Sequence, residues 1–237
     1  MEKGIQMIKR RNYAHILSML IILVCGSANT WAAPDDSELV TAAGNGDLSR
    51  VKALLDANAN VNAKADGGAT ALIAASQNGY EEVVQMLLTA KADVDAKTDN
   101  CTTALMRAAQ KGHEQVVQEL LAAKADVNAR RKDGITVLMQ ASQEGHPRIV
   151  QMLLAAGANV DARLDNGATA LMLASQIGDA AVVKALLAKK AKVNAKAGNG
   201  VTALMLASKY RHQDVVKLLK AAGARITGAV QAFLMPA

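Results

Sequence analysis

The chain has 237 residues, of which 51% are apolar and only 2% aromatic, and its formal net charge is +6. So few aromatic side chains exclude an ordinary globular core built on bulky rings, because Ala, Leu, Val and Met must fill the interior instead. The charge does not indicate a nucleic-acid-binding protein, since part of the excess lies in Lys3, Lys9, Arg10 and Arg11 near the N-terminus.

The N-terminal segment has the order basic, apolar, small that is typical of a secretory signal peptide. Lys9-Arg10-Arg11 precedes a run from Ile16 to Val24 that is apolar apart from Ser18, and small residues follow between Gly26 and Ala33. The apolar run has about 10 residues, whereas a membrane-spanning helix needs about 20. We therefore predict a signal peptide over residues 1–32 and a periplasmic or secreted mature protein.

Cleavage is predicted after Ala32, and three alternatives stay open: cleavage after Ala28, an uncleaved membrane anchor, and lipidation at Cys25. Val24 argues against lipidation, because a small residue usually precedes a lipidated cysteine. If Cys25 leaves with the signal peptide, Cys101 is the one cysteine of the mature chain and no internal disulfide can form. An odd cysteine of this kind indicates an intermolecular disulfide, a reactive thiol, or a loop position that has drifted from glycine.

Most of the remaining chain repeats with a period of 33 residues. Each repeat contains a Thr-X-Leu motif, and its threonines are Thr70, Thr103, Thr136, Thr169 and Thr202. A fixed period between 20 and 50 residues predicts a solenoid of stacked repeats. We expect two helices in each repeat, the first capped by the threonine hydroxyl and the second carrying, in most repeats, a Val-Val-X-X-Leu-Leu face.

No repeat can bury that apolar face alone, so the stacking of neighbours is expected to form the core. We divide the chain after the signal peptide into an N-terminal capping repeat at 36–63, repeats at 64–96, 97–129, 130–162 and 163–195, a C-terminal repeat at 196–228, and a tail at 229–237. The tail holds the one Phe of the chain, Phe233, and is expected to cover the last helix pair or to dock to a partner.

These repeats resemble ankyrin repeats over about residues 36–228. The matching motifs are Gly-X-Thr-X-Leu, Ala-Ala or Ala-Ser, Gly-His, Val-Val-X-X-Leu-Leu and Ala-Asp-Val-Asn-Ala. The resemblance implies an all-α fold, an ankyrin-repeat α-solenoid of helix–turn–helix units joined by short hairpin-like loops. It also implies a non-enzymatic protein–protein interaction module, here an exported protein of bacterial type.

Two features depart from the family's pattern. The family's Thr-Pro-Leu-His reads Thr-Ala-Leu-Met in most repeats. The histidine ring that ties neighbouring loops by hydrogen bonds in the family is therefore absent. We expect the replacing residues to be core rather than a binding or redox-sensing row: Ile73, Met106, Met139, Met172 and Met205. In addition, Lys91, Lys124 and Lys190 stand where the family prefers glycine for a left-handed turn after the second helix.

The sequence contains no catalytic motif that we recognise, and we expect no catalytic site, no metal site and no cofactor. His113, His146 and His212 occupy one position of the repeat, at the start of the second helix. Neighbouring helices lie about 8–10 Å apart and Zn–N bonds are about 2 Å long, so one metal could not bind a histidine from each repeat. We therefore expect an architectural role for these histidines.

The resemblance implies that the loops and first helices line a concave groove that holds the partner. A basic residue begins each repeat from 64 onward, and together these are expected to form a basic row along the groove: Lys64, Lys97, Arg130, Arg163 and Lys196. The other expected partner-binding residues are Arg107, Lys111, Gln140, Glu144, Ile177 and Tyr210. Such a row would attract an acidic protein, although Asp66, Asp99, Asp133 and Asp165 lie close enough to neutralise part of its field.

The expected partner is thus another protein, with acidic proteins as one class. We expect no nucleic acid, no membrane contact after signal cleavage, and a monomeric mature chain. The sequence leaves open whether the protein is a resident periplasmic scaffold or a secreted effector that engages host-cell proteins. An enzyme or enzyme subunit is a further alternative, which a pocket with clustered titratable groups would favour.

Overall fold

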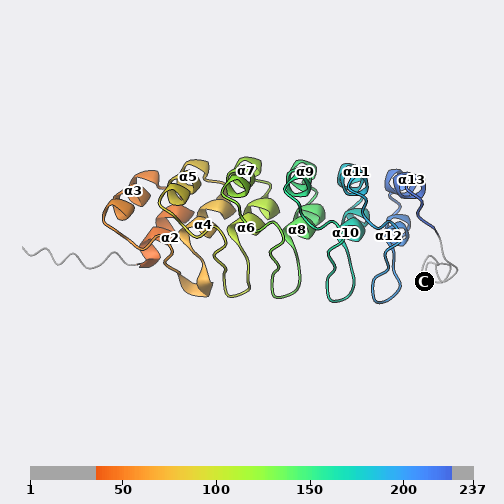
Figure 1. Cartoon of the computed structure of the whole chain (residues 1–237), viewed down its shortest axis with the longest axis horizontal. Coiled ribbons are helices and arrows are strands. Elements are labelled where there is room, and N and C mark those ends of the chain that lie inside the picture. The colour runs from red at the N-terminus through yellow and green to blue at the C-terminus, as the bar shows by residue number, and fades with distance from the viewer. Residues whose placement is uncertain (1–35, 226–237) are drawn as a thin grey trace, which may run out of the picture. The chain divides into compact units, whose positions relative to one another are not determined.

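The helices of the computed structural model form pairs, and the pairs lie side by side (Figure 1). The chain divides into two parts, residues 1–35 and 36–237, and the structure describes residues 36–225. The predicted signal peptide with its cleavage site and Cys25, and the predicted tail at 229–237, lie outside the described residues and stay predictions.

Residues 36–225 form twelve α-helices in six pairs, one pair within each predicted repeat. The first helices of the pairs are α2 (Asp36–Gly44), α4 (Ala71–Asn78), α6 (Ala104–Lys111), α8 (Val137–Glu144), α10 (Ala170–Ile177) and α12 (Ala203–Lys209). The second helices are α3 (Leu48–Asp56), α5 (Glu81–Thr89), α7 (Glu114–Ala122), α9 (Pro147–Ala155), α11 (Ala180–Ala188) and α13 (Gln213–Ala221). A short 3-10 helix, η1 (Asp66–Gly68), precedes α4.

The loops before α4 and α8 are closed like hairpins, as the resemblance implies. Antiparallel bridges join Lys64 to Thr70 and Arg130 to Thr136, and they are isolated bridges rather than strands. Along the described chain the regular structure is therefore helical, which confirms the all-α fold class.

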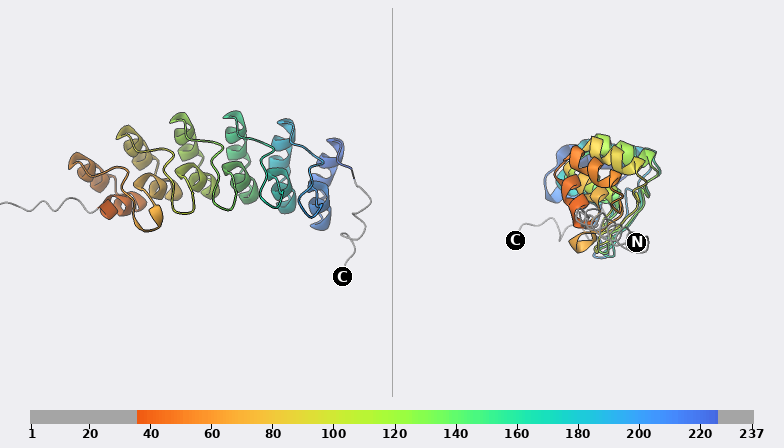
Figure 2. Two further views of the ribbon diagram at one scale, coloured as in Figure 1. Left: turned by 60° about the horizontal axis from the view of Figure 1, so that its bottom comes forward. Right: turned by 90° about the vertical axis from the view of Figure 1, so that its left-hand side faces the viewer.

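Each first helix packs on the first helices of the adjacent pairs, and each second helix on the adjacent second helices. The row of first helices lies between the row of second helices and the loops (Figure 1, Figure 2). This arrangement is that of an α-solenoid, in which a repeat contacts mainly its neighbours.

The predicted threonine caps are confirmed. The Oγ1 atoms of Thr70, Thr103, Thr136, Thr169 and Thr202 each accept a hydrogen bond from the backbone N–H three residues on, at 3.3–3.4 Å. Each hydroxyl satisfies one of the donors that the first turn of a helix leaves open. The threonines therefore fix where α4, α6, α8, α10 and α12 begin.

The apolar face of the second helices is slightly narrower than predicted. In each repeat from 64 to 195 both valines, or Ile149 and Val150, are buried together with the first leucine of the motif, as in Val116, Val117 and Leu120. The second leucine of the motif was also expected to point inward; Leu154 is buried, but Leu88, Leu121 and Leu187 are half-buried. The second leucine follows the buried leucine by one residue, so its side chain points to the edge of the buried face rather than to its centre.

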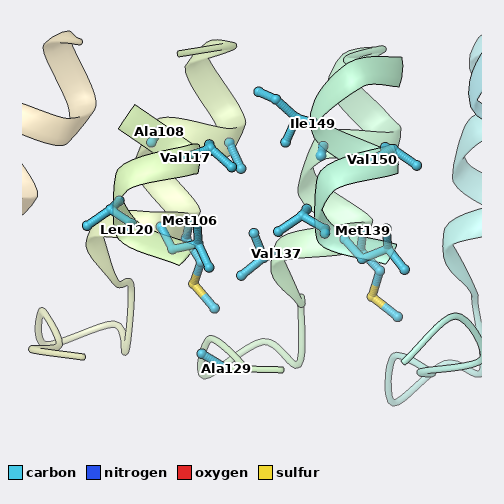
Figure 3. Close-up of a cluster of buried hydrophobic side chains, with 14 of the residues drawn as sticks. Met106, Ala108, Val117, Leu120, Ala129, Val137, Met139, Ile149 and Val150 are labelled. Carbon is cyan, nitrogen blue, oxygen red and sulfur yellow. The ribbon is translucent and has the colours of Figure 1, made fainter. Parts of the chain in front are cut away.

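The residues that replace the family's histidine are buried in the core. Met106 and Met139 come from equivalent positions of α6 and α8, and Figure 3 shows them in a cluster of buried side chains from both helix rows, with Leu120 close to Met106. The prediction of a core role is confirmed, because an exposed binding row would need accessible sulfur atoms.

Hydrogen bonds tie each repeat to the next. At every junction between repeats, an Asn or Asp side chain accepts a hydrogen bond from the backbone N–H of a residue 31 positions later. The acceptors are Asn62, Asp95, Asn128, Asp161 and Asn194, at 2.7–2.9 Å. These acceptors stand in the Ala-Asp-Val-Asn-Ala motif or its equivalent, which explains the recurrence of a polar residue there.

The turn after the second helix is left-handed, as predicted. Lys91, Lys124 and Lys190 have φ of 66°, 64° and 61°, and Gly157 has φ of 91° at the same place in its repeat. A side chain in this conformation brings Cβ too close to the backbone. The three lysines therefore carry backbone strain that glycine would remove.

Replacing Lys124 by glycine is expected to raise stability. Glycine adopts this φ at a cost lower by about 1 kcal/mol. In a domain of this size that gain raises Tm by about 2–4 °C, and thermal unfolding followed by circular dichroism measures it.

Gly157→Lys is the matched control, since nothing lies within 4 Å of a Cβ added there. It should lower Tm by a similar amount. If Lys124→Gly lowered Tm instead, the attraction of the lysine charge to the C-terminus of α7 would outweigh the strain.

Candidate partner-binding surface

The basic row lies along the loops, and three of its members tie one loop to the next. The Nζ atom of Lys64 donates to the carbonyl oxygen of Lys97 at 3.0 Å. Arg130 donates in the same way to the carbonyl oxygen of Arg163, and Arg163 to that of Lys196. Each bond spans 33 residues, so an Arg or Lys at this position has a structural role in addition to its charge.

The five side chains of the basic row are nevertheless exposed. Backbone bonds between loops accompany them, from the Asp99 N–H to the Gly67 carbonyl oxygen at 3.0 Å and from the Gly198 N–H to the Asn166 carbonyl oxygen at 2.7 Å. The row is therefore a firmly held edge of the molecule that keeps its charge in solvent.

The predicted site residues of α6 and α8 have different degrees of exposure. Lys111 and Glu144 are exposed, and Arg107 is half-buried with Nη1 bonded to Gln110 Oε1 at 3.3 Å. Gln140 is only 6% exposed, so it does not offer the free side chain that the sequence suggested. Its Oε1 accepts from Arg131 Nη1 at 3.5 Å, and its Nε2 donates to Glu144 Oε1 at 3.3 Å.

Arg131 was not among the predicted site residues. It reaches from the loop to α8, where its Nη1 contacts Gln140 and its Nη2 bonds Asp133 Oδ2 at 2.9 Å. The Nε atoms of Arg107 and Arg131 are buried donors without a hydrogen-bond partner. The sequence feature that could have indicated Arg131 is the pair Arg130-Arg131, because no other loop of the array begins with two basic residues.

Ile177 and Tyr210 lie at equivalent positions, at the end of α10 and just after α12. They are 51% and 46% exposed. The ring of Tyr210 stacks on that of His212 at 6.3 Å between centroids, and Lys209 Nζ lies 5.8 Å from the Tyr210 ring centroid. These contacts leave both apolar side chains accessible on the first-helix side.

The three histidines are architectural, as expected. The Nε2 atoms of His113, His146 and His212 lie 2.9–3.1 Å from the carbonyl oxygens of Gln77, Gln110 and Gln176 in the preceding repeat. Because a carbonyl oxygen carries no hydrogen, Nε2 must be the donor. Each ring also rests on the glycine that ends the preceding first helix, where an added Cβ would lie 2.3–2.8 Å from ring atoms.

In residues 36–225, no group of three His, Cys, Asp or Glu residues is placed to hold a metal ion. A hollow of about 680 Å³ between α7 and α9 is open to solvent and contains one ion pair, Glu114–Arg148 at 3.1 Å, rather than a titratable cluster. None of the described helices is long and apolar enough to cross a bilayer.

Cys101 is half-buried. Its φ is 58°, the left-handed conformation of the glycines at the same place in other loops, and its N–H donates to the Thr98 carbonyl oxygen at 2.8 Å. This geometry fits a loop position that has drifted from glycine. An intermolecular disulfide through Cys101 stays a prediction.

Comparison with known families identifies the repeats. A family model described as ankyrin repeats in three copies matches residues 6–98, 39–131, 90–164 and 138–228, which together cover most of the chain. The chain belongs to the ankyrin repeat family. Ankyrin repeats are in general protein–protein interaction modules and are typically non-enzymatic. No curated protein matches this ankyrin chain in sequence.

The histidine contact between ankyrin repeats can be tested at His146. His146→Ala removes a half-buried hydrogen bond and a ring contact, and should lower the free energy of unfolding by about 1 kcal/mol. Chemical denaturation measures this loss.

Arg148→Ala at the same junction is the control. Its ion pair with Glu114 has side chains 76% and 50% exposed, and such a pair contributes about 0–1 kcal/mol. Equal losses in the two variants would contradict a special role for the histidine.

Proposed function

We propose that this ankyrin protein is a non-enzymatic scaffold that acts outside the cytoplasm and binds another protein through its loops and first helices. The observation that carries the proposal is where the repeats differ from one another. The recurring Thr, Leu and Val residues of the helices are largely buried, and recurring Asn, Asp and His residues tie one repeat to the next, whereas two positions of the first helices change from repeat to repeat. Specificity in a repeat protein resides in such changing surface residues.

The first of these positions reads Ala74, Arg107, Gln140, Leu173 and Leu206. The second reads Asn78, Lys111, Glu144, Ile177 and Tyr210. In each set the members are 33 residues apart, and the two positions are four residues apart on one helix, so their side chains share a face. One partner can therefore contact several repeats at once.

An acidic partner is supported by the charge of the loops. The loops from 64, 97, 130, 163 and 196 to the following threonines contain seven Lys or Arg and four Asp. A surface of this sign increases the rate of encounter with an acidic protein and decreases it with a basic one. We propose that the mature chain presents this surface as a monomer.

Export is supported by the basic, apolar and small order of residues 1–32. We expect cell fractionation to recover the native protein from the periplasm, with an intact mass that corresponds to residues 33–237. Cys25→Ala should change neither the compartment nor the mass.

Other outcomes of the fractionation and mass measurement would each indicate a different fate of the N-terminal segment. A full-length mass in the membrane fraction would indicate an uncleaved anchor, and a shift caused by Cys25→Ala would indicate lipidation. Recovery from the culture medium would favour a secreted effector, and recovery of the full-length chain from the cytoplasm would overturn the proposal of export.

The proposed surface can be tested by photo-crosslinking in the native cell. A benzophenone amino acid at Lys111 or Gln143, both exposed on first helices, is expected to capture a partner protein. The same amino acid at Gln118 or Gln151, exposed on second helices, should not.

A charge variant sharpens this experiment. Lys97→Glu should decrease capture from the first-helix sites, because it reverses a charge of the basic row, and Lys184→Glu on α11 is the matched control with the same charge change. Arg130 and Arg163 are less suitable, since they also tie the loops together. Capture from the second helices alone would contradict the proposed surface.

A further inference from the structure

Three large apolar side chains are exposed in the described residues: Tyr80, Ile177 and Tyr210. Tyr80 has a structural explanation, because its ring rests on Gly46 as the histidine rings rest on the later glycines. The ring of Tyr210 stacks on His212 but stays 46% exposed, and Ile177 is 51% exposed. The two residues occupy equivalent positions of adjacent repeats, at the end of α10 and just after α12. Large apolar residues gathered on a surface indicate a contact site.

Three leucines extend this pair into an apolar patch, which we define as Leu164, Leu173, Ile177, Leu206 and Tyr210. Leu173 and Leu206 precede Ile177 and Tyr210 by four residues, one turn earlier on the same face of α10 and of α12. Leu164 occupies the loop position of Arg131, whose guanidinium contacts Gln140, the residue equivalent to Leu173. Leu164, Leu173 and Leu206 are partly buried against the core, so the patch is held in place.

The two preceding repeats present a basic centre on the same face, which we define as Arg107, Lys111, Arg131 and Lys132. Across the loops and first helices of residues 97–112 and 130–145 there are six Lys or Arg and three Asp or Glu. Arg107 and Arg131 are held by Gln110, Gln140 and Asp133, whereas Lys111 and Lys132 are exposed. A partner carboxylate can therefore pair with the two lysines, beside the positive charge of the guanidinium groups.

The basic centre and the apolar patch adjoin, because α8 packs on α10. We propose, on the basis of the proposed function, that this face binds a protein segment that carries acidic residues at one end and large apolar side chains at the other. The carboxylates contact the basic centre and the apolar side chains cover the apolar patch. Adjacent helices are about 8–10 Å apart, so an extended segment needs about three residues for each repeat.

Two other occupants are disfavoured by charge. The chain's own residues 226–237 include Val230, Phe233, Leu234 and Met235 but no Asp or Glu, so they could cover the apolar patch without satisfying the basic centre. A second copy placed patch to patch would bring two basic centres together, which costs energy through like-charge repulsion. An acidic partner with an apolar end satisfies both areas.

The test uses synthetic fluorescent peptides and the full chain. The probe has about 14 residues, long enough to span four repeats when extended, with Glu in one half and Leu and Phe in the other. A second peptide has the same composition with the two kinds alternating. By fluorescence anisotropy the first peptide should bind at least about tenfold more tightly, because only it can place both halves at once.

Variants locate the two contacts. Ile177→Gln and Tyr210→Gln should each weaken binding by about tenfold, as the loss of an interface hot spot does, while Tyr80→Gln, the third exposed apolar residue, should not. Lys111→Gln should weaken binding and decrease its dependence on salt, while Lys184→Gln on α11 should do neither. Circular dichroism checks that each variant is folded.

Two results would overturn the inference: equal binding of the two peptides, or no effect of Ile177→Gln and Tyr210→Gln on binding. Tighter probe binding by Phe233→Gln would instead identify the chain's own tail as the occupant. Self-association that Ile177→Gln abolishes, measured by light scattering, would identify a second copy. If photo-crosslinking captures a partner from the first helices but the captured segment lacks acidic and apolar ends, the proposed function stands and this inference alone fails.

Discussion

The contact of each repeat with the next is the constraint on which the rest of this ankyrin protein depends. One helix pair leaves its valines and leucines uncovered, and the following pair covers them. Polar groups then fix the distance between pairs, through an Asn or Asp side chain at every junction and through a histidine ring over a glycine at three of them. Because these ties recur, the residues that make them are restricted to a few types, whereas two positions of the first helices differ widely between repeats.

Much of the fold could be predicted from periodicity alone. The helix starts at the threonines, the buried methionines and the left-handed lysines all follow from position within the repeat, because local geometry repeats with sequence. The burial of Gln140 did not follow, since it depends on a neighbour that differs between repeats. Arg131 covers Gln140 in one repeat only, and a period cannot reveal such a contact.

The candidate surface shows the same limit more strongly. The sequence indicated Ile177 and Tyr210 as site residues, but their relation to Leu164, Leu173 and Leu206 became visible only when loops and helices were placed together. The basic row was predicted as a binding feature, whereas the structure adds hydrogen bonds from Lys64, Arg130 and Arg163 to carbonyl oxygens. A long cationic side chain can hold a loop and face solvent at once, and sequence spacing does not separate the two roles.

Arg211 has a consequence for how such an array could be lengthened. It stands where Gly79, Gly112, Gly145 and Gly178 end the earlier first helices, and it has φ of 62°. At Gly79, Gly112 and Gly178 the next repeat's histidine comes within 2.3–2.8 Å of where a Cβ would be. In an engineered copy of the 163–195 repeat, placed in register after residue 228 and carrying a histidine in place of Asp179, the histidine ring would collide with the Arg211 side chain. Anyone who builds a longer array from this protein would therefore need glycine at residue 211 first.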